Sequence, residues 1–295
     1  KMIVKISPFV PKSFKKTEKI NGISVSSIHC GLKKKSKPDL VLIKFNKPSK
    51  IFGVFTNSQT PGESIIWNKS ILKYGKVSAI LINSGNANVF NGVKGKISQK
   101  KIVQKLSKEL RLKENEIYTA STGIIGEPLD HRKIINKIPV LIKKLNNEPS
   151  SWFEAAEAIK TTDTYPKLDS KKLKTNKSII INGIAKGSGM IAPNMATMLS
   201  FIFTNAKISE KDFSITFKEM VDNTFNSITV DGDTSTSDMV LLVFVKNEDK
   251  GIRPGNFSKS EFKKSLKDLM LKLAHFIVKD GEGASKFITI SVKGT

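Results

Sequence analysis

The sequence predicts a mixed α/β (α+β) fold in which layered β-sheets are covered by helices. Short apolar runs of strand length alternate with longer stretches whose apolar residues recur at helical spacing. This alternation extends along the whole chain without an internal repeat or a low-complexity segment, as expected for sheets packed against helices. At 295 residues, with 39% hydrophobic and 26% charged residues, the chain is long and apolar enough to bury a large core.

The first hundred residues alternate strand patterns with turn signals. Strands are expected at 20–30 (with a turn at Asn21-Gly22), 39–45, 51–56 and 77–82, and a turn is expected at 46–49. The last of these strands ends in the small, amide-rich stretch 83–88. Such a stretch is typical either of a ligand-binding loop or of a tight connection that uses Asn and Gly for positive φ.

Helices and strands continue to alternate in the rest of the chain. Helices are expected at 95–111, 131–145, 151–159 (capped by Ser150 or Ser151), 209–225 (with Ser209 and Asp212 as a capping pair) and 258–279. Strands are expected from 117 into a turn at 121–123, and at 178–184, 198–203, 239–245 and 287–292. The lysine-rich stretch 167–177 is interpreted as a linker.

The net charge of +24 and the pI near 9.9 suggest a polyanionic partner, but the distribution of charge argues against it. Only three basic residues are arginine, the side chain best suited to bidentate phosphate and guanine contacts. The lysines are scattered, and aromatic residues do not alternate with them as a stacking platform requires. We therefore expect no specific binding of nucleic acid.

Metal and redox chemistry find little support. Cys30 is the only cysteine, and the histidines lack metal-ligand spacing. Residues 231–238, DGDTSTSD, contain three aspartates (Asp231, Asp233 and Asp238) but lack the spacing and terminal Glu of a calcium loop, so a hydrogen-bonded turn is expected. Apolar runs are too short for a signal peptide or a membrane span, which predicts a soluble cytoplasmic protein without membrane partners.

The stretch 186–206 combines a Gly/Ser/Pro-rich loop with a buried strand, and Thr197 stands where they meet. A hydroxyl at the start of a rigid buried strand is a plausible position for a nucleophile. Locally, an ordinary loop feeding a core strand explains the same pattern better, with Thr197 as a β-branched strand residue. The Thr122-Gly123 turn likewise allows two interpretations: its backbone N–H groups can form an oxyanion hole, or it can be only a turn.

Six of these segments match one family in order along the chain. They are INSGNAN (82–88), STGIIG (121–126), TTDTYPK (161–167), KGSGMIAPNMATML (186–199), ITVDGDTSTSD (228–238) and DGEGASK (280–286). The sequence resembles the ornithine acetyltransferases of arginine biosynthesis, which are glutamate N-acetyltransferases and often bifunctional with amino-acid acetyltransferase. The resemblance covers essentially all 295 residues. It implies an ornithine-acetyltransferase/DmpA-like fold with two subdomains, broadly similar to that of N-terminal-nucleophile hydrolases but differently connected.

The resemblance also implies a precursor that cuts itself between Ala196 and Thr197, giving an α chain (1–196) and a β chain (197–295). Family members transfer acetyl from N-acetylornithine to glutamate by a ping-pong route through an acetyl-threonine. The chemistry suits an N-terminal threonine, because its own α-amine lies beside the weakly nucleophilic hydroxyl as a general base. The unperturbed pKa of that amine is about 8, so a sizeable fraction is neutral at cellular pH.

The remaining site residues are carried over from the same motifs. Thr122 and Gly123 match the oxyanion-hole pair, and Lys186 matches a lysine that pairs with a substrate carboxylate. Thr161 matches a substrate contact, with Thr162 as the alternative if the register differs by one. Glu282 matches an acidic contact for the α-ammonium of ornithine or glutamate. The resemblance implies no metal and no organic cofactor, leaves acetyl-CoA open as a co-substrate, and implies αβ heterodimers that assemble further.

Relatives continue past the last expected strand with a segment that holds two more substrate contacts, an asparagine and a hydroxyl residue. The sequence therefore looks C-terminally truncated relative to its family. The alternative function, from another enzyme class, is a self-cleaving amidohydrolase or aminopeptidase of related scaffold, which would release its product to water without needing glutamate.

Overall fold

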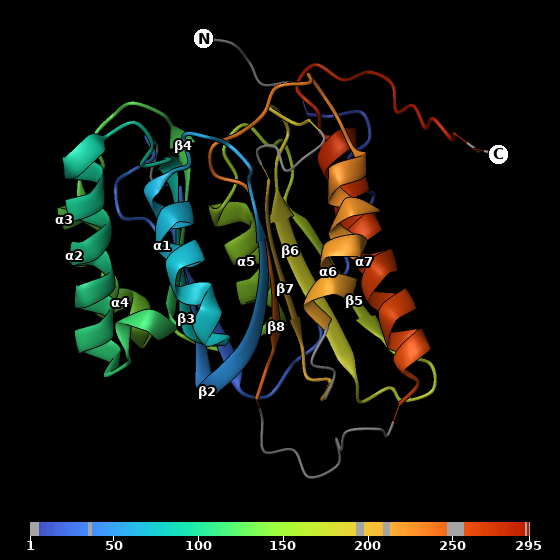
Figure 1. The fold of residues 1–295 in the computed structure, drawn as a ribbon, viewed down its shortest axis with the longest axis horizontal. Helices are drawn as coiled ribbons and strands as arrows, with labels where there is room; N and C mark the ends of the chain where they lie inside the picture. Colours follow the sequence, from blue (N-terminus) through green and yellow to red (C-terminus); the bar gives the residue numbers. More distant parts are fainter. Residues whose placement is uncertain are drawn as a thin grey trace.

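A computed structural model describes residues 6–34, 37–192, 198–208, 213–246, 257–292 and 294. Within these residues eight strands form one mixed sheet, in the order β4-β3-β2-β8-β7-β6-β5 with β1 paired to β2 (Figure 1). The strands are β1 (Ile23–Ile28), β2 (Leu40–Phe55), β3 (Lys76–Asn86), β4 (Ile117–Ile124), β5 (Lys167–Lys172), β6 (Ile180–Lys186), β7 (Leu199–Thr204) and β8 (Met239–Phe244). Helices cover this sheet, which confirms the expected mixed α/β architecture.

The α-helices flank the sheet in groups, with α2, α3 and α4 beyond the β3–β4 end and α6 and α7 beside β5–β8 (Figure 1). They are α1 (Glu63–Ile71), α2 (Gly92–Leu110), α3 (His131–Ile135), α4 (Ile138–Lys143), α5 (Pro149–Ala158), α6 (Phe213–Asp222) and α7 (Lys259–Lys279), with 3₁₀ turns η1 (Leu72–Tyr74), η2 (Glu114–Glu116) and η3 (Phe225–Ser227). The helices at 95–111 and 258–279 are thereby confirmed, whereas α1 was not expected from the sequence.

Alternate residues of the central strands face different cores, because side chains along a strand point to opposite faces. In β8, Leu241 and Val243 belong to the core that includes Trp152 of α5, whereas Leu242 and Phe244 belong to the core under α6 and α7. A third core packs α2 and α4 against the β3–β4 end of the sheet. Both faces of the central strands are apolar, which explains their continuous apolar sequence.

The two segments on either side of the expected cleavage position share this sheet. β6 ends at Lys186 and β7 begins at Leu199, and the two strands pair antiparallel. β8 is parallel to β7 on one side and antiparallel to β2 on the other. β7 and β8 therefore lie between strands that precede residue 196, so chains 1–196 and 197–295 would share one sheet and its cores.

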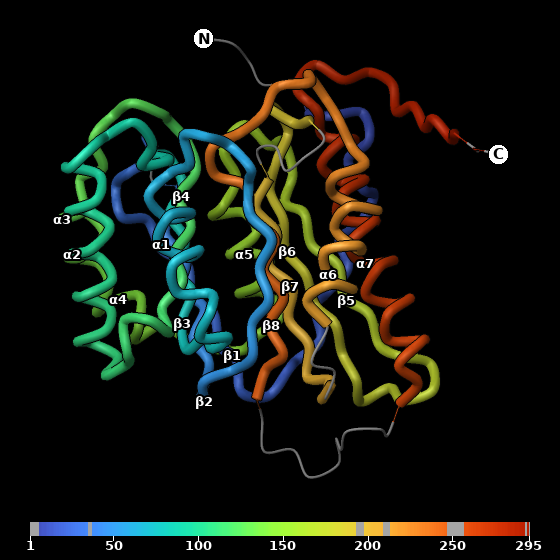
Figure 2. The backbone as a smooth tube through the Cα atoms, viewed as in Figure 1, coloured from blue at the N-terminus to red at the C-terminus, as the bar shows by residue number. Residues whose placement is uncertain are grey.

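Two expected interruptions of strands are wrong. The turn expected at 46–49 lies inside β2, which crosses the sheet as one strand (Figure 2). The pairing of β2 with β3 shifts register between Lys44 and Ser49, so a bulge takes up the turn-forming residues. The loop expected at 83–88 starts later, because Asn83 to Asn86 pair with β4 as the end of β3, whereas the positive φ expected of a tight connection is found at Gly85 and Asn88.

Two other expectations fail through local chemistry. The helix expected at 131–145 is divided into α3 and α4, with Pro139 in the first turn of α4, where proline is tolerated. The helix at 151–159 begins earlier, at Pro149, and its N-cap is Glu148 without a side-chain hydrogen bond, so neither Ser150 nor Ser151 caps it.

The expected linker at 167–177 is also wrong, because its first six residues form β5. The last expected strand, 287–292, is not one: these residues have no strand partner, and Ile290 is 83% exposed. In Figure 1 this segment extends away from the helices. An apolar alternation forms a strand only when another strand is available to pair with it. The expected capping pair Ser209 and Asp212 lies outside the described residues.

Candidate active site

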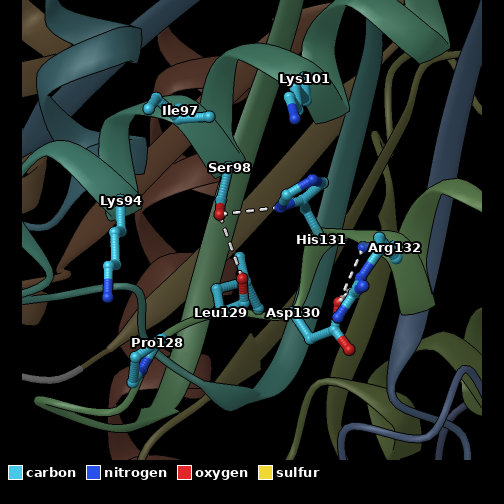
Figure 3. A pocket seen from close by; sticks show the side chains of 9 residues that line it. All are labelled: Lys94, Ile97, Ser98, Lys101, Pro128, Leu129, Asp130, His131 and Arg132. Atoms are coloured by element: carbon cyan, nitrogen blue, oxygen red, sulfur yellow. Dashed lines mark hydrogen bonds and ion pairs between the residues drawn. The ribbon is translucent and has the colours of Figure 1, made fainter.

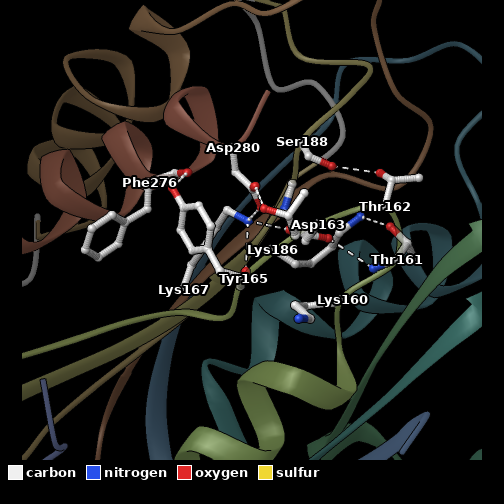
Figure 4. A network of polar contacts seen from close by, with 12 residues as sticks. Lys160, Thr161, Thr162, Asp163, Tyr165, Lys167, Lys186, Ser188, Phe276 and Asp280 are labelled. Carbon is white, nitrogen blue, oxygen red and sulfur yellow. Dashed lines mark hydrogen bonds and ion pairs between the residues drawn. The ribbon is translucent and has the colours of Figure 1, made fainter. Parts of the chain in front are cut away.

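Lys186, at the end of β6, joins two distant segments of the chain. Its Nζ donates to Thr161 Oγ1 at 2.8 Å and to Thr122 Oγ1 at 3.2 Å. Lys186 is 2% exposed, and burial lowers the pKa of its ammonium group. The structure thus brings three sequence-predicted site residues together around one buried cation, as Figure 4 shows for Lys186 and Thr161.

Thr122 and Gly123 lie in the last residues of β4 rather than in a turn. The pairing is irregular here, because Asn86 pairs with both Thr122 and Ile124. Gly123 has φ of +130°, and a Cβ at this position would lie 2.4 Å from the carbonyl carbon of Gly85. Only glycine fits, so the backbone at Thr122-Gly123 is held in a conformation that a regular strand would not give.

Thr162 and Glu282 both adjoin the loop that follows Lys186. Thr162 Oγ1 lies 2.7 Å from Ser188 Oγ, and the Glu282 N–H donates to the Ser188 carbonyl at 2.8 Å. A Cβ on Gly189 would lie 2.6 Å from Glu282 Oε1, so the carboxylate rests directly on this glycine. Of the two candidate threonines, Thr161 contacts Lys186 and Thr162 contacts the neighbouring loop.

The expected cleavage residues Ala196 and Thr197 lie outside the described residues. Met198, which follows Thr197, donates its N–H to Asp238 Oδ1 at 2.6 Å. Asp238 is completely buried, and burial raises its pKa to about 8. Within the described part of the chain its Oδ2 has no hydrogen-bond partner. The start of β7 is therefore fixed to the residue before β8 by a carboxyl group that burial favours in its neutral form.

Within 231–238 the Asp231 carboxylate accepts the Asp233 N–H at 3.1 Å, a local side-chain-to-backbone bond, but the stretch is bent rather than a regular hydrogen-bonded turn. Asp231 accepts the N–H groups of Met190 at 2.6 Å and Ile191 at 2.9 Å, which ties this stretch to the loop after β6. Across the described ranges, no group of three or more His, Cys, Asp or Glu residues is arranged to hold a metal ion. In the part of the chain that the structure describes, no helix is both long and apolar enough to cross a membrane.

A buried ion cluster close to Lys186 was not predicted from the sequence. Lys167 Nζ lies 2.7 Å from Asp163 Oδ1 and 2.6 Å from Asp280 Oδ2, and all three side chains are completely buried (Figure 4). Both aspartates stand inside the motifs TTDTYPK and DGEGASK, which was the available signal. Lys167 is the last residue of TTDTYPK, but apart from that motif its local sequence does not distinguish it from the surface lysines that follow it.

A cleft away from Lys186 lies on α2 and α3, lined by Ser98, His131 and several cations, with a volume of about 480 Å³ (Figure 3). Ser98 Oγ lies 3.0 Å from His131 Nδ1, which resembles a nucleophile and its base. The neighbouring Asp130, however, accepts from Arg132 at its Oδ1 rather than from the imidazole. The described contacts therefore supply no acidic third member that would complete a Ser-His-Asp triad.

Comparison with known proteins identifies the family. The ArgJ family matches residues 24–295. The arginine biosynthesis bifunctional protein ArgJ of Bartonella quintana is 43% identical over 299 residues, covering 99% of this chain and 72% of that protein. The ornithine acetyltransferase of Mycobacterium tuberculosis, solved with ornithine, has a TM-score of 0.54 and 27% identity over 59% of this chain and 92% of its own.

A more distant structure shows the fold alone. The L-aminopeptidase D-Ala-esterase/amidase of Ochrobactrum anthropi, described as a variant of the Ntn-hydrolase fold, has a TM-score of 0.53 at 8% identity. It covers 92% of this chain and 87% of its own, so the architecture extends over nearly the whole molecule. The sequence match, the coverage of the relatives and the shared fold agree: the chain belongs to the ArgJ family and is an acyltransferase.

Proposed function

We propose that the chain transfers an acetyl group from N-acetylornithine to glutamate through an acetyl-Thr197 intermediate, after cutting itself between Ala196 and Thr197. The observation that carries the proposal is the contact of the buried Lys186 ammonium with the hydroxyls of Thr122 and Thr161. Three residues expected to serve one reaction come from separate segments and meet at one point. Family membership and the solved ornithine acetyltransferases support the same activity.

In the proposed cleavage, the Thr197 hydroxyl attacks the carbonyl carbon of Ala196 and the peptide nitrogen leaves as the new α-amine. The resulting ester between Ala196 and the hydroxyl is then hydrolysed, which frees both groups of Thr197. In acetyl transfer the α-amine takes the hydroxyl proton while the oxygen attacks the acetyl carbonyl. Ornithine leaves with its amine protonated, and the amine of glutamate takes the acetyl group in the second half-reaction.

The described residues suit the roles around this nucleophile. A tetrahedral intermediate develops negative charge on the former carbonyl oxygen, and fixed donors at Thr122 and Gly123 would stabilise it. The Lys186 ammonium is held on hydroxyl groups rather than on a carboxylate, so its charge remains available to the carboxylate of a substrate. Glu282 is exposed beside the loop after Lys186 and would receive the substrate ammonium.

The experiment that tests the proposal supplies N-acetylornithine with and without glutamate, and measures acetylglutamate, ornithine and acetate. The proposal predicts acetylglutamate in equal amount to ornithine, and little acetate, when glutamate is present. Release of acetate at the same rate with or without glutamate would instead identify the alternative amidohydrolase. Replacing N-acetylornithine by acetyl-CoA in the same assay decides whether the chain is also an amino-acid acetyltransferase. The αβ assembly is part of the proposal and is measured by mass in solution.

A further inference from the structure

The buried Asp163–Lys167–Asp280 cluster is an unusual use of a lysine. The Lys167 Nζ donates to both carboxylates and to the Tyr165 carbonyl at 3.3 Å. Removing three charged groups from water is costly, and well-packed apolar residues often give equal or greater stability than a buried ion pair. A contribution to stability alone therefore explains this cluster poorly.

Each carboxylate of the cluster also holds a segment of the candidate site. Asp163 accepts the Gly187 N–H at 2.6 Å and the Thr161 N–H at 3.0 Å. It is therefore hydrogen-bonded to the residue that follows Lys186 and to the backbone of Thr161, which Lys186 contacts. Asp280 accepts the Thr164 N–H at 2.9 Å and stands two residues before Glu282. Lys167 thus connects the three segments that carry Thr161, Lys186 and Glu282.

The arrangement of charge shows what the cluster does for Lys186. Burial opposes ionisation of Asp163, but Lys167 and then Lys186 outweigh it and hold its pKa below the usual range. Asp163 is therefore an anion close to both lysines, yet only Lys167 makes the direct ion pair. The described hydrogen bonds of the Lys186 ammonium go to Thr122 and Thr161 hydroxyls.

We propose that Lys167 is a positioning residue that occupies the Asp163 carboxylate and so keeps Lys186 available to a substrate carboxylate. The inference rests on the proposed function, in which Lys186 pairs with that carboxylate. Without the Lys167 ammonium, Asp163 would keep a buried negative charge on which Lys186 exerts the next strongest cationic influence. The Lys186 ammonium would then move toward Asp163 and away from the two hydroxyls, because a buried charge left unpaired is strongly unfavourable.

The proposal has a pH signature that a purely structural role lacks. Burial lowers the pKa of Lys186, Asp163 raises it, and Lys167 lowers it. The other charged groups that influence Lys186 are Asp238 and Glu282, which raise its pKa, and Lys33, on the loop after β1. Removing the Lys167 charge leaves these groups in place and raises the pKa of Lys186, so Lys186 stays protonated to higher pH.

The test replaces Lys167 by methionine, with Lys171→Met as the matched control. Lys171 lies on the same strand, but its side chain is 28% exposed and pairs with Asp268 at 3.2 Å at the surface. For Lys167→Met we expect KM for N-acetylornithine to rise about tenfold, the effect of one charge-assisted hydrogen bond, with kcat nearly unchanged. The alkaline limb of the kcat/KM profile moves to higher pH, and Lys171→Met changes neither quantity.

A double variant separates positioning from stability. Lys167→Met with Asp280→Asn removes one positive and one negative charge, so the net charge of the cluster returns to its wild-type value while Asp163 still lacks its ion pair. We expect the double variant to regain much of the thermal stability lost by Lys167→Met and to retain the raised KM. A KM that returns to the wild-type value together with stability would overturn the proposal. If the single variant does not fold, this double variant carries the same comparison.

A measurement without turnover keeps this inference distinguishable from the proposed function. Titration of the ¹³Cε signal of Lys186, assigned by its loss in Lys186→Met, reports its pKa directly. We expect the pKa to rise in Lys167→Met and to stay unchanged in Lys171→Met; an unchanged pKa in Lys167→Met overturns the inference even in an active enzyme. Wild-type protein that makes no acetylglutamate refutes the proposed function, while the titration still decides the ion-pair argument.

Discussion

At the scale of single residues, the candidate site depends on backbone and protonation states that few side chains could supply. Gly123 permits β4 to approach β3 at the expected oxyanion position. Asp238 holds the residue that follows Thr197 with a carboxyl group whose neutral form is favoured. The contributions of Gly123 and Asp238 can both be tested by measuring the free energy of unfolding, which requires no assumption about the substrate.

Gly123→Ala should destabilise the fold and abolish transfer. Alanine would adopt a strained φ of +130° and place its Cβ 2.4 Å from the Gly85 backbone, which has to move. Strain of this kind costs about 1–3 kcal/mol, measured by urea unfolding. Gly126→Ala is the matched control, since φ is +82° there but a Cβ has no atom within 4 Å. Equal losses in the two variants would refute the close approach to Gly85.

Asp238→Asn should stabilise the protein increasingly as the pH rises from about 4 to about 8. The unfolded carboxyl ionises near its ordinary value of 3.8, whereas burial keeps the folded group neutral up to a pKa of about 8. The folded state then binds more protons, so the wild type loses stability with rising pH by on the order of 1 kcal/mol per unit. Asparagine can still accept the Met198 N–H but does not titrate. Urea unfolding at pH 5 and pH 7.5 tests this, and a difference between the proteins that is independent of pH would contradict it.

At the scale of helices and strands, the sequence was most informative where a single periodicity persists. The helices α2 and α7 and the buried strands β7 and β8 follow from apolar spacing within a few residues. In contrast, β5 resembled part of a linker because four of its six residues are charged. Its place in the sheet depends on partners far away in the sequence: Lys167 pairs with Asp280, and Lys272 of α7 pairs with Asp169.

In the candidate site too, some residues could be predicted from the sequence and others depend on partners that are distant in the sequence. Motifs identified Thr122, Thr161, Lys186 and Glu282, and the structure brings their segments together. The role of Lys167 could not be predicted, because a lysine at a strand end has the same local pattern whether it is buried or solvated. The bulge that continues β2 through 46–49 was similarly hidden, since the same residues favour a turn when no neighbouring strand is considered.

The first turn of α7 is capped by the side chain of Ser258. Ser258 Oγ accepts the Glu261 N–H at 3.2 Å, which satisfies one of the unpaired donors at the helix start. Ser258→Ala should lower the free energy of unfolding by about 1 kcal/mol. Ser260→Ala, an exposed position inside the first turn, should change it by less than about 0.5 kcal/mol. Equal effects in urea unfolding would show that the cap contributes nothing specific.

At the scale of the whole molecule, the expected cleavage position separates two chains that share one β-sheet and its cores. β7 and β8 lie between β6 and β2, and their side chains belong to cores shared with α5, α6 and α7. A cut at 196–197 removes one covalent bond and leaves these contacts in place. Cleavage there would therefore change the covalent link between β6 and β7 rather than the fold.

The two chains should consequently remain one particle after cleavage. We expect 1–196 and 197–295 to elute together in size-exclusion chromatography under native conditions, and to separate only in denaturant. The uncut Thr197→Ala variant serves as the control and should elute at the same volume. Separation of the wild-type chains in native buffer would show that the central strands are not shared in the mature protein.

Whether Thr197 becomes an acylated N-terminal nucleophile is decided by the intact mass of the protein after incubation with N-acetylornithine and no glutamate. We expect two chains, split before Thr197, with one acetyl group added to the chain 197–295 and lost again when glutamate is supplied. Thr197→Ala should remain a single, unacetylated chain. An uncut wild-type protein that transfers acetyl at full rate, or one that is cut but carries its acetyl group elsewhere, would contradict this expectation.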